Sequence, residues 1–179
     1  MIRKPWAAVT LLLIGVFTGS LQAREPEDPC VRAGSRRLQT AVSEGRARSL
    51  TFRRLVDRIG ASNVIVYLDD SAHLGIGVGG QLSFVSHAGG RRYVRVLVDQ
   101  RLEGRQLIAL VGHELEHAVE VADASDVVDQ ASMARLYARI GFSRRVANGG
   151  VAYDTGEAIA AGGRIMRELG ATVTTVASR

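Results

Sequence analysis

The stretch Val111-Gly112-His113-Glu114-Leu115-Glu116-His117-Ala118-Val119 decides the fold, because it lies inside a long segment with helical periodicity. That segment, from Leu102 to Ala122, is predicted to form one helix. At about 100° per residue, His113 and His117 lie one turn apart and point to the same side. The opposite side of the helix is apolar and is predicted to face the core: Ile108, Val111, Leu115, Ala118, Val119 and Ala122.

The polar side of this helix carries the residue types of a divalent metal site. Two histidine nitrogens one turn apart can bind the same Zn²⁺ ion, each at about 2.0–2.1 Å. Glu114 lies beside these histidines, where its carboxylate can take a proton from a water at the metal without being a ligand. Glu116, between the histidines, is expected to be exposed to solvent. The sequence thus predicts His113 and His117 as metal ligands and Glu114 as a general base.

Three segments before this helix have the pattern of strands. Residues 64–68 are a short β-branched run, and residues 81–86 and 91–98 alternate between polar and apolar side chains. The glycines within residues 87–90 indicate a hairpin turn between the last two segments. We expect these segments to form a small, mostly antiparallel sheet of about three strands.

Helical spacing also appears on both sides of these segments. Residues 35–59 are predicted to form one or two helices, and residues 127–140 and 154–169 one helix each. Asp154 or Thr155 can cap the last of these helices. Strands followed by helices are typical of the α+β class, with the sheet packed against the histidine-bearing helix and further helices.

The first 23 residues have the pattern of a secretory signal peptide. Arg3 and Lys4 precede an apolar run from Trp6 to Phe17, and small or polar residues follow as far as Ala23. The run is shorter than the roughly 20 residues that would span a bilayer. We therefore expect cleavage after Ala23, a periplasmic or secreted protein, and no stable membrane insertion after cleavage.

The remaining chain is expected to form one domain. Residues 24–34 are predicted to be a flexible segment, residues 35–172 the folded domain, and residues 173–179 a C-terminal tail. The lone Cys30 excludes a disulfide framework and is expected at the surface. The net charge is +5, but the arginine pairs are scattered rather than gathered in one block, so nucleic-acid binding is not expected. The sequence does not indicate an oligomeric state.

The pattern from His113 to His117 resembles the HExxH motif of zincin metallopeptidases. The order of sheet, motif helix and later helix between Val64 and Leu169 is similar to that of minimal, single-domain gluzincins. The resemblance implies a hydrolase that cleaves peptide bonds of a peptide or protein substrate with a zinc-bound water and Glu114 as general base. A metzincin is not expected, because the glycine and third histidine that would follow the motif are absent.

A third zinc ligand must be a carboxylate, because no useful histidine follows His117. In gluzincins this ligand comes from a later helix, and Asp154 and Glu157 lie where such a helix begins. Glu157, followed three residues later by Ala160, resembles the gluzincin Glu-x-x-Ala pattern. We favour Asp154, with Glu157 as the alternative, because Gly156 suggests a close approach of the backbone there.

Other polar residues have less defined expectations. Glu120 shares the face of the two histidines but lies too far along the helix axis, so it is expected to contact a ligand or lie at the surface. Tyr137 and Tyr153 are candidate donors to the oxyanion that such a reaction would form, with packing in the core as the favoured alternative for Tyr137. The alternative function is a catalytically inactive, metal-binding or structural exported domain, because about 156 mature residues leave little room for a deep substrate cleft.

Overall fold

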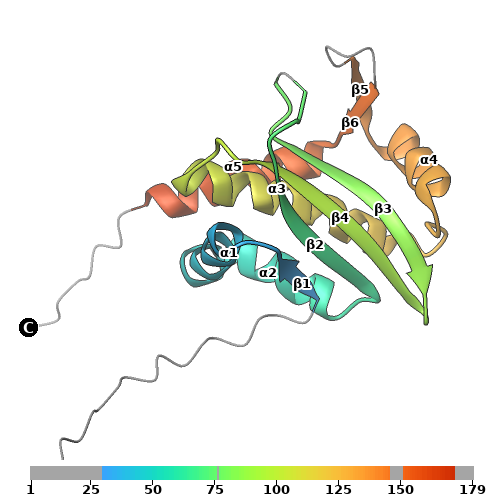
Figure 1. Cartoon of the computed structure of the whole chain (residues 1–179), viewed down its shortest axis with the longest axis horizontal. Helices are drawn as coiled ribbons and strands as arrows, with labels where there is room; N and C mark the ends of the chain where they lie inside the picture. Colours follow the sequence, from blue (N-terminus) through green and yellow to red (C-terminus); the bar gives the residue numbers. More distant parts are fainter. Residues whose placement is uncertain (1–29, 76, 146–150, 172–179) are drawn as a thin grey trace, which may run out of the picture.

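The computed structural model describes residues 30–75, 77–145 and 151–171 of the chain (Figure 1). The predicted signal peptide, residues 1–23, and the predicted tail, residues 173–179, lie outside these residues. The described elements form an α+β fold, as predicted, with a mixed sheet, a two-stranded hairpin and five helices.

The main sheet has four strands in the order β1-β2-β4-β3. Strands β1 and β2 are parallel, β2 and β4 are parallel, and β3 and β4 form an antiparallel hairpin. Two glycines with positive φ, Gly89 and Gly90, make its turn. The bounds are β1 Val31–Ala33, β2 Val64–Ser71, β3 Gly80–Ala88 and β4 Arg91–Asp99.

The prediction of a mostly antiparallel sheet of about three strands was therefore wrong in its details. Strand β4 occupies the centre beside β2 because its alternate residues Val94, Val96 and Val98 are all fully buried. Strand β3 is largely exposed and lies at the edge of the sheet. The local sequence pattern predicts which residues form strands. It does not predict which strand of the β3–β4 hairpin pairs with β2.

Strand β1 lies in a segment that was predicted to be flexible. Val31 pairs with Val66 of β2, and its side chain is buried. Cys30, expected at the surface, is also buried, with 7% of its area exposed. Three residues of strand are too short to give a periodic signal in the sequence.

The described residues form five helices, and those predicted at residues 102–122, 127–140 and 154–169 are present with slightly different ends. The segment 35–59 forms two helices, separated at Ser49. No helix in the described part of the chain is long and apolar enough to cross a membrane. The bounds are α1 Arg36–Arg48, α2 Leu50–Gly60, α3 Gly104–Asp123, α4 Gln130–Ile140 and α5 Gly156–Gly170.

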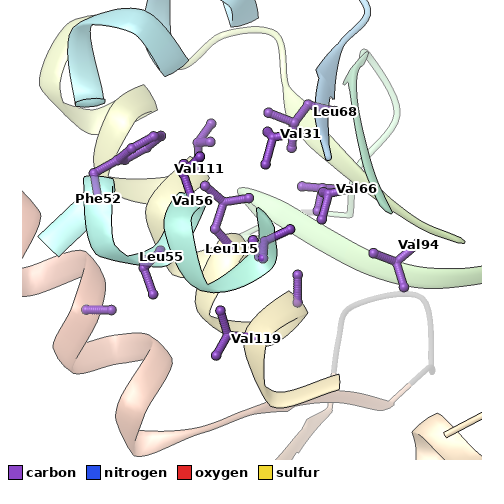
Figure 2. Close-up of a cluster of buried hydrophobic side chains, with 14 of the residues drawn as sticks. Val31, Phe52, Leu55, Val56, Val66, Leu68, Val94, Val111, Leu115 and Val119 are labelled. Carbon is purple, nitrogen blue, oxygen red and sulfur yellow. The ribbon is translucent and has the colours of Figure 1, made fainter. Parts of the chain in front are cut away.

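Helix α3 is the centre of the packing. Its residues Val111, Leu115 and Val119 lie among side chains of α2 and of the sheet (Figure 2). The predicted apolar face of α3 is therefore confirmed. Helix α5 covers another side of α3, and it comes so close that a Cβ atom on Gly112 would lie 2.1 Å from Cδ1 of Ile165.

The prediction for Glu116 was wrong. Only 8% of its area is exposed, and its carboxylate lies 3.9 Å from the guanidinium of Arg58 on α2. Helices α2 and α5 both pack against α3, so the side that the sequence left to solvent is covered as well.

A short hairpin, which the sequence did not predict, connects α4 to α5. Its strands are β5, Phe142–Arg145, and β6, Val151–Asp154, and Phe142 pairs with Asp154. The hairpin matters for the site because β6 ends at Asp154.

Ser49 joins helices α2 and α5. Its hydroxyl caps α2 by accepting a hydrogen bond from the Phe52 amide, at 3.0 Å, and donates to the carboxylate of Glu168. Glu168 also accepts from the hydroxyl of Thr51 at 2.7 Å. Burial raises the pKa of Glu168, but these hydrogen bonds outweigh burial, and the pKa is lowered overall.

Ser49→Ala is expected to lower the free energy of unfolding by about 1–3 kcal/mol, because it removes the cap of α2 and a buried donor to Glu168. Urea unfolding at neutral pH measures this change. The control is Thr40→Ala at an exposed position of α1, which should stay within about 0.5 kcal/mol of the wild type. A similarly small effect of Ser49→Ala would contradict the assignment.

The contribution of Glu168 should also depend on pH. Because its folded-state pKa is lowered, the ionised carboxylate stabilises the fold above the ordinary carboxyl pKa of about 4.3, and this gain disappears as the pH falls below it. Glu168→Gln should therefore reduce stability at pH 7 and have little effect near pH 3. An equal loss at both pH values would show that the charge of Glu168 is not involved.

Candidate metal centre

The two histidines of α3 lie together, as the helical spacing predicted. The rings of His113 and His117 meet edge to face, with centroids 4.9 Å apart. The His117 side chain is almost fully buried, whereas 19% of the His113 side chain is exposed. One side of the pair is thus enclosed by protein and the other is open to solvent.

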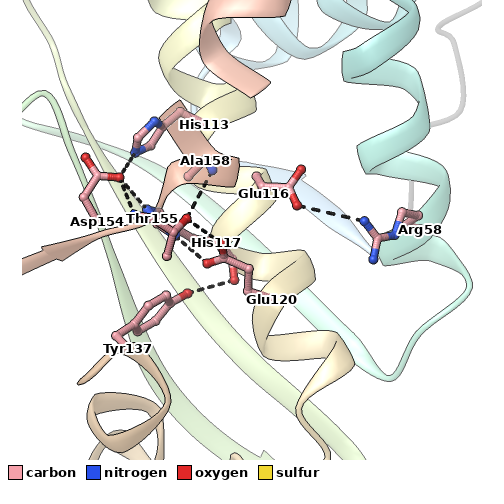
Figure 3. Close-up of polar contacts among 9 residues, drawn as sticks. All are labelled: Arg58, His113, Glu116, His117, Glu120, Tyr137, Asp154, Thr155 and Ala158. Carbon is pink, nitrogen blue, oxygen red and sulfur yellow. Dashed lines mark hydrogen bonds and ion pairs between the residues drawn. The ribbon is translucent and has the colours of Figure 1, made fainter. Parts of the chain in front are cut away.

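Asp154 completes a group of three side chains (Figure 3). Its Oδ1 atom lies 3.3 Å from Nε2 of His113 and 3.6 Å from Nε2 of His117. The three residues each offer a ligand atom, and these atoms all lie within 4.8 Å of one another. Within the described ranges, this is the one cluster of His, Cys, Asp or Glu that has such spacing.

The distances from Asp154 to the two histidines suit a divalent metal ion such as zinc. Zinc–nitrogen and zinc–oxygen bonds of about 2.0–2.2 Å in tetrahedral geometry place neighbouring ligand atoms about 3.3–3.6 Å apart. The two distances from Asp154 are 3.3 and 3.6 Å. Two imidazoles and one carboxylate are also a donor set that suits zinc better than calcium or magnesium.

The position of Asp154 follows from the strand–helix junction. Thr155, not Asp154, caps α5, because its hydroxyl accepts from the Ala158 amide at 3.1 Å. The carboxylate of Asp154 is therefore directed to the histidines, where Oδ1 also accepts from the Thr155 amide at 2.8 Å. Glu157, the alternative ligand, is exposed in the first turn of α5 and is not part of the group.

Glu120 contacts a histidine of the group, which was one of the two expected roles. Its Oε2 atom lies 2.8 Å from Nδ1 of His117, and its Oε1 atom accepts from the Thr155 hydroxyl at 2.5 Å. A carboxylate on Nδ1 fixes the ring orientation and leaves Nε2 directed at the metal position. The same hydrogen bonds tie α3 to the start of α5.

Neither predicted oxyanion donor lies in that position. The Tyr137 hydroxyl donates to the backbone carbonyl of His117 at 2.9 Å, and its ring packs on the edge of the His117 ring. Tyr137 therefore supports the histidine from the core side. Tyr153 precedes Asp154 on β6, so the alternation of a strand directs it to the opposite face.

Glu114 lies deeper than the two histidines. Only 4% of its area is exposed, and its side chain packs closely against Gly80 of β3. Burial raises the pKa of Glu114 to about 7, with a lowering effect from His117 and a raising effect from Asp154. A carboxyl group with a pKa near neutral can both accept and return a proton at physiological pH.

The electrostatic state of the histidines reflects their neighbours. Burial and the nearby His117 lower the pKa of His113. Burial alone would also lower the pKa of His117, but hydrogen bonds with Asp154 and Glu120 raise it to about 9. In the metal-free protein the two carboxylates thus attract a proton to the place where a cation would reside. The other two histidines, His73 and His87, are exposed and do not belong to the group.

No family model, curated protein or solved structure matches this chain. The resemblance to zincins therefore rests on residues 113–117 and on the His-His-Asp group that the fold assembles.

Gly141→Ala is expected to weaken zinc binding about 10- to 100-fold, because a Cβ atom there would lie 2.6 Å from the Asp154 carbonyl oxygen. The backbone conformation of Gly141, with φ −111°, suits any residue, so the effect would come from the contact. Zinc titration against a competing chelator measures it. Gly156→Ala is the control, because a Cβ atom there meets nothing within 4 Å; the close backbone approach expected at Gly156 from the sequence was therefore wrong. Equal zinc affinities for both variants would contradict this role of Gly141.

Proposed function

We propose that this protein is a zinc-dependent metallopeptidase that hydrolyses peptide bonds of a peptide or protein substrate. His113, His117 and Asp154 would hold the zinc ion, and Glu114 would act as the general base. One observation carries the proposal: the fold brings Oδ1 of Asp154 to 3.3 and 3.6 Å from the ring nitrogens of two histidines one helical turn apart, and this His-His-Asp group can hold a metal ion.

Zinc bound in this group would polarise the scissile carbonyl and make a nearby water more acidic. Glu114 would accept a proton from that water as the water attacks the carbonyl carbon. The carbon–nitrogen bond then breaks, and Glu114 returns the proton to the departing amine. The carboxyl group of Glu114 ends in the state in which it began, so it can serve the next turnover.

The surrounding hydrogen bonds support this assignment of roles. Glu120 holds the Nδ1 side of His117, and Tyr137 fixes the backbone beneath it. The carboxylate of Asp154 accepts a hydrogen bond from the Thr155 amide, and this bond orients the carboxylate. Hydrogen bonds within the protein thus orient His117 on α3 and Asp154 on β6 without a bound metal.

The proposed site of action is the periplasm or the exterior of the cell, because residues 1–23 have the pattern of a secretory signal peptide. The alternative is an exported domain that binds metal without catalysis. It is favoured by one observation, the positions of Tyr137 and Tyr153, which leave both predicted oxyanion donors directed elsewhere.

The test combines metal content with turnover. The purified protein should contain about one zinc ion per chain and cleave a casein-type substrate. Glu114→Gln should retain the zinc and reduce cleavage at least about 100-fold, because the amide cannot accept the proton. Glu157→Gln, an exposed change on α5, is the matched control and should alter neither property.

The outcomes separate the two functions. Zinc without cleavage in the wild type would favour the inactive metal-binding domain. Undiminished cleavage by Glu114→Gln would remove Glu114 as the base, and absence of zinc after zinc loading would reject both functions.

A further inference from the structure

The edge strand β3 begins beside the proposed general base. Gly80 pairs with Val98 of β4, and residues that pair across strands project to the same face of a sheet. Val98 is fully buried. Position 80 therefore faces the interior and α3 rather than solvent.

The side chain of Glu114 fills the space next to Gly80. A Cβ atom built on Gly80 would lie 2.3 Å from Oε1 of Glu114, 2.8 Å from Cδ and 2.9 Å from Cγ. A Cβ atom does not come this close to atoms of another side chain, so a side chain at position 80 and Glu114 in its present place exclude each other.

The backbone gives no other reason for a glycine at this position. The described glycines with positive φ are Gly77, Gly89, Gly90 and Gly104, and Gly80 is not among them. Alanine could therefore adopt the conformation of position 80 without strain. The requirement comes from the contact with Glu114.

We propose that Gly80 is a positioning residue for Glu114: the missing side chain at the start of β3 is what lets the carboxylate occupy its place beside the His-His-Asp group. This inference rests on the proposed peptidase function. If position 80 gains a methyl group, the flexible Glu114 side chain yields, because β3 is held by its backbone pairing with β4. The three atoms nearest to a Cβ atom on Gly80 all belong to Glu114, so we expect the change to act on Glu114 and to leave the metal ligands in place.

Gly79 provides a matched control one residue earlier. A Cβ atom on Gly79 would lie 3.4 Å from both methyl groups of Leu110 and 3.5 Å from Leu102. These are ordinary van der Waals contacts or close to them, and none involves the site. The same Gly→Ala change at the two neighbouring positions thus differs in its contact with Glu114.

Gly80→Ala and Gly79→Ala should be compared in the full-length protein with bound zinc. Gly80→Ala should keep about one zinc per chain and the wild-type KM, and lose about 10- to 100-fold in kcat, since a displacement of about 1 Å at a reacting group can cost that much. Gly79→Ala should stay within about twofold of the wild type in all three. A wild-type kcat for Gly80→Ala would overturn the inference, as would a loss of zinc.

A double-variant cycle tests whether the effect passes through Glu114. Glu114→Ala removes Cγ, Cδ and Oε1, the three atoms that a methyl group at position 80 would overlap. Gly80→Ala should therefore lower the midpoint of urea unfolding in the wild-type background and leave it unchanged in the Glu114→Ala background. The same loss in both backgrounds would show that Gly80 acts elsewhere. Failure of the peptidase proposal is a separate result, because the wild type itself would then cleave no peptide.

Discussion

The carboxylate of Asp154 contacts both imidazoles of α3, and the site depends on this contact. Its Oδ1 atom lies 3.3 Å from one ring nitrogen and 3.6 Å from the other, although Asp154 lies 37 residues beyond His117 in the sequence. The contact brings the end of β6 and the start of α5 onto the helix that forms the centre of the core. Negative charge so near a buried and a half-buried imidazole ring is stable when a cation lies between them, and in its absence a proton on His117 takes that role.

Hydrogen bonds and small residues around the site keep the Asp154 carboxylate close to the two histidines. Glu120 links His117 to Thr155, which caps the helix after the ligand strand. Gly141 allows the Asp154 carbonyl to approach closely, because a Cβ atom there would lie 2.6 Å from the carbonyl oxygen. Small residues and shared hydrogen bonds thus allow two elements to approach where larger side chains would hold them apart.

The sequence predicted the elements that have a strong internal period. Helix α3, its apolar face and the pairing of His113 with His117 follow from spacing alone, because a helix fixes which residues are neighbours. The position of Glu116 could not be predicted, since its burial depends on α2 and α5 packing beside α3. The same limit applies to β1, to the hairpin β5–β6 and to the central place of β4, which depend on pairing between distant segments.

The choice between Asp154 and Glu157 shows where sequence reasoning about the site stops. Both are acidic and three residues apart, and the motif pattern alone favoured Glu157. In the structure, Thr155 caps α5, Oδ1 of Asp154 lies within 3.6 Å of both histidine rings, and Glu157 is exposed at the start of α5. Gly80 carried no sequence signal, because its role is visible only as the space that Glu114 fills.

The most direct test is a crystal structure of the zinc-loaded protein with anomalous scattering measured at the zinc edge. The account predicts one peak about 2.0–2.2 Å from the three atoms Nε2 of His113, Nε2 of His117 and Oδ1 of Asp154. A structure with no peak between these atoms, or with zinc on the histidines and Asp154 beyond bonding distance, would contradict it.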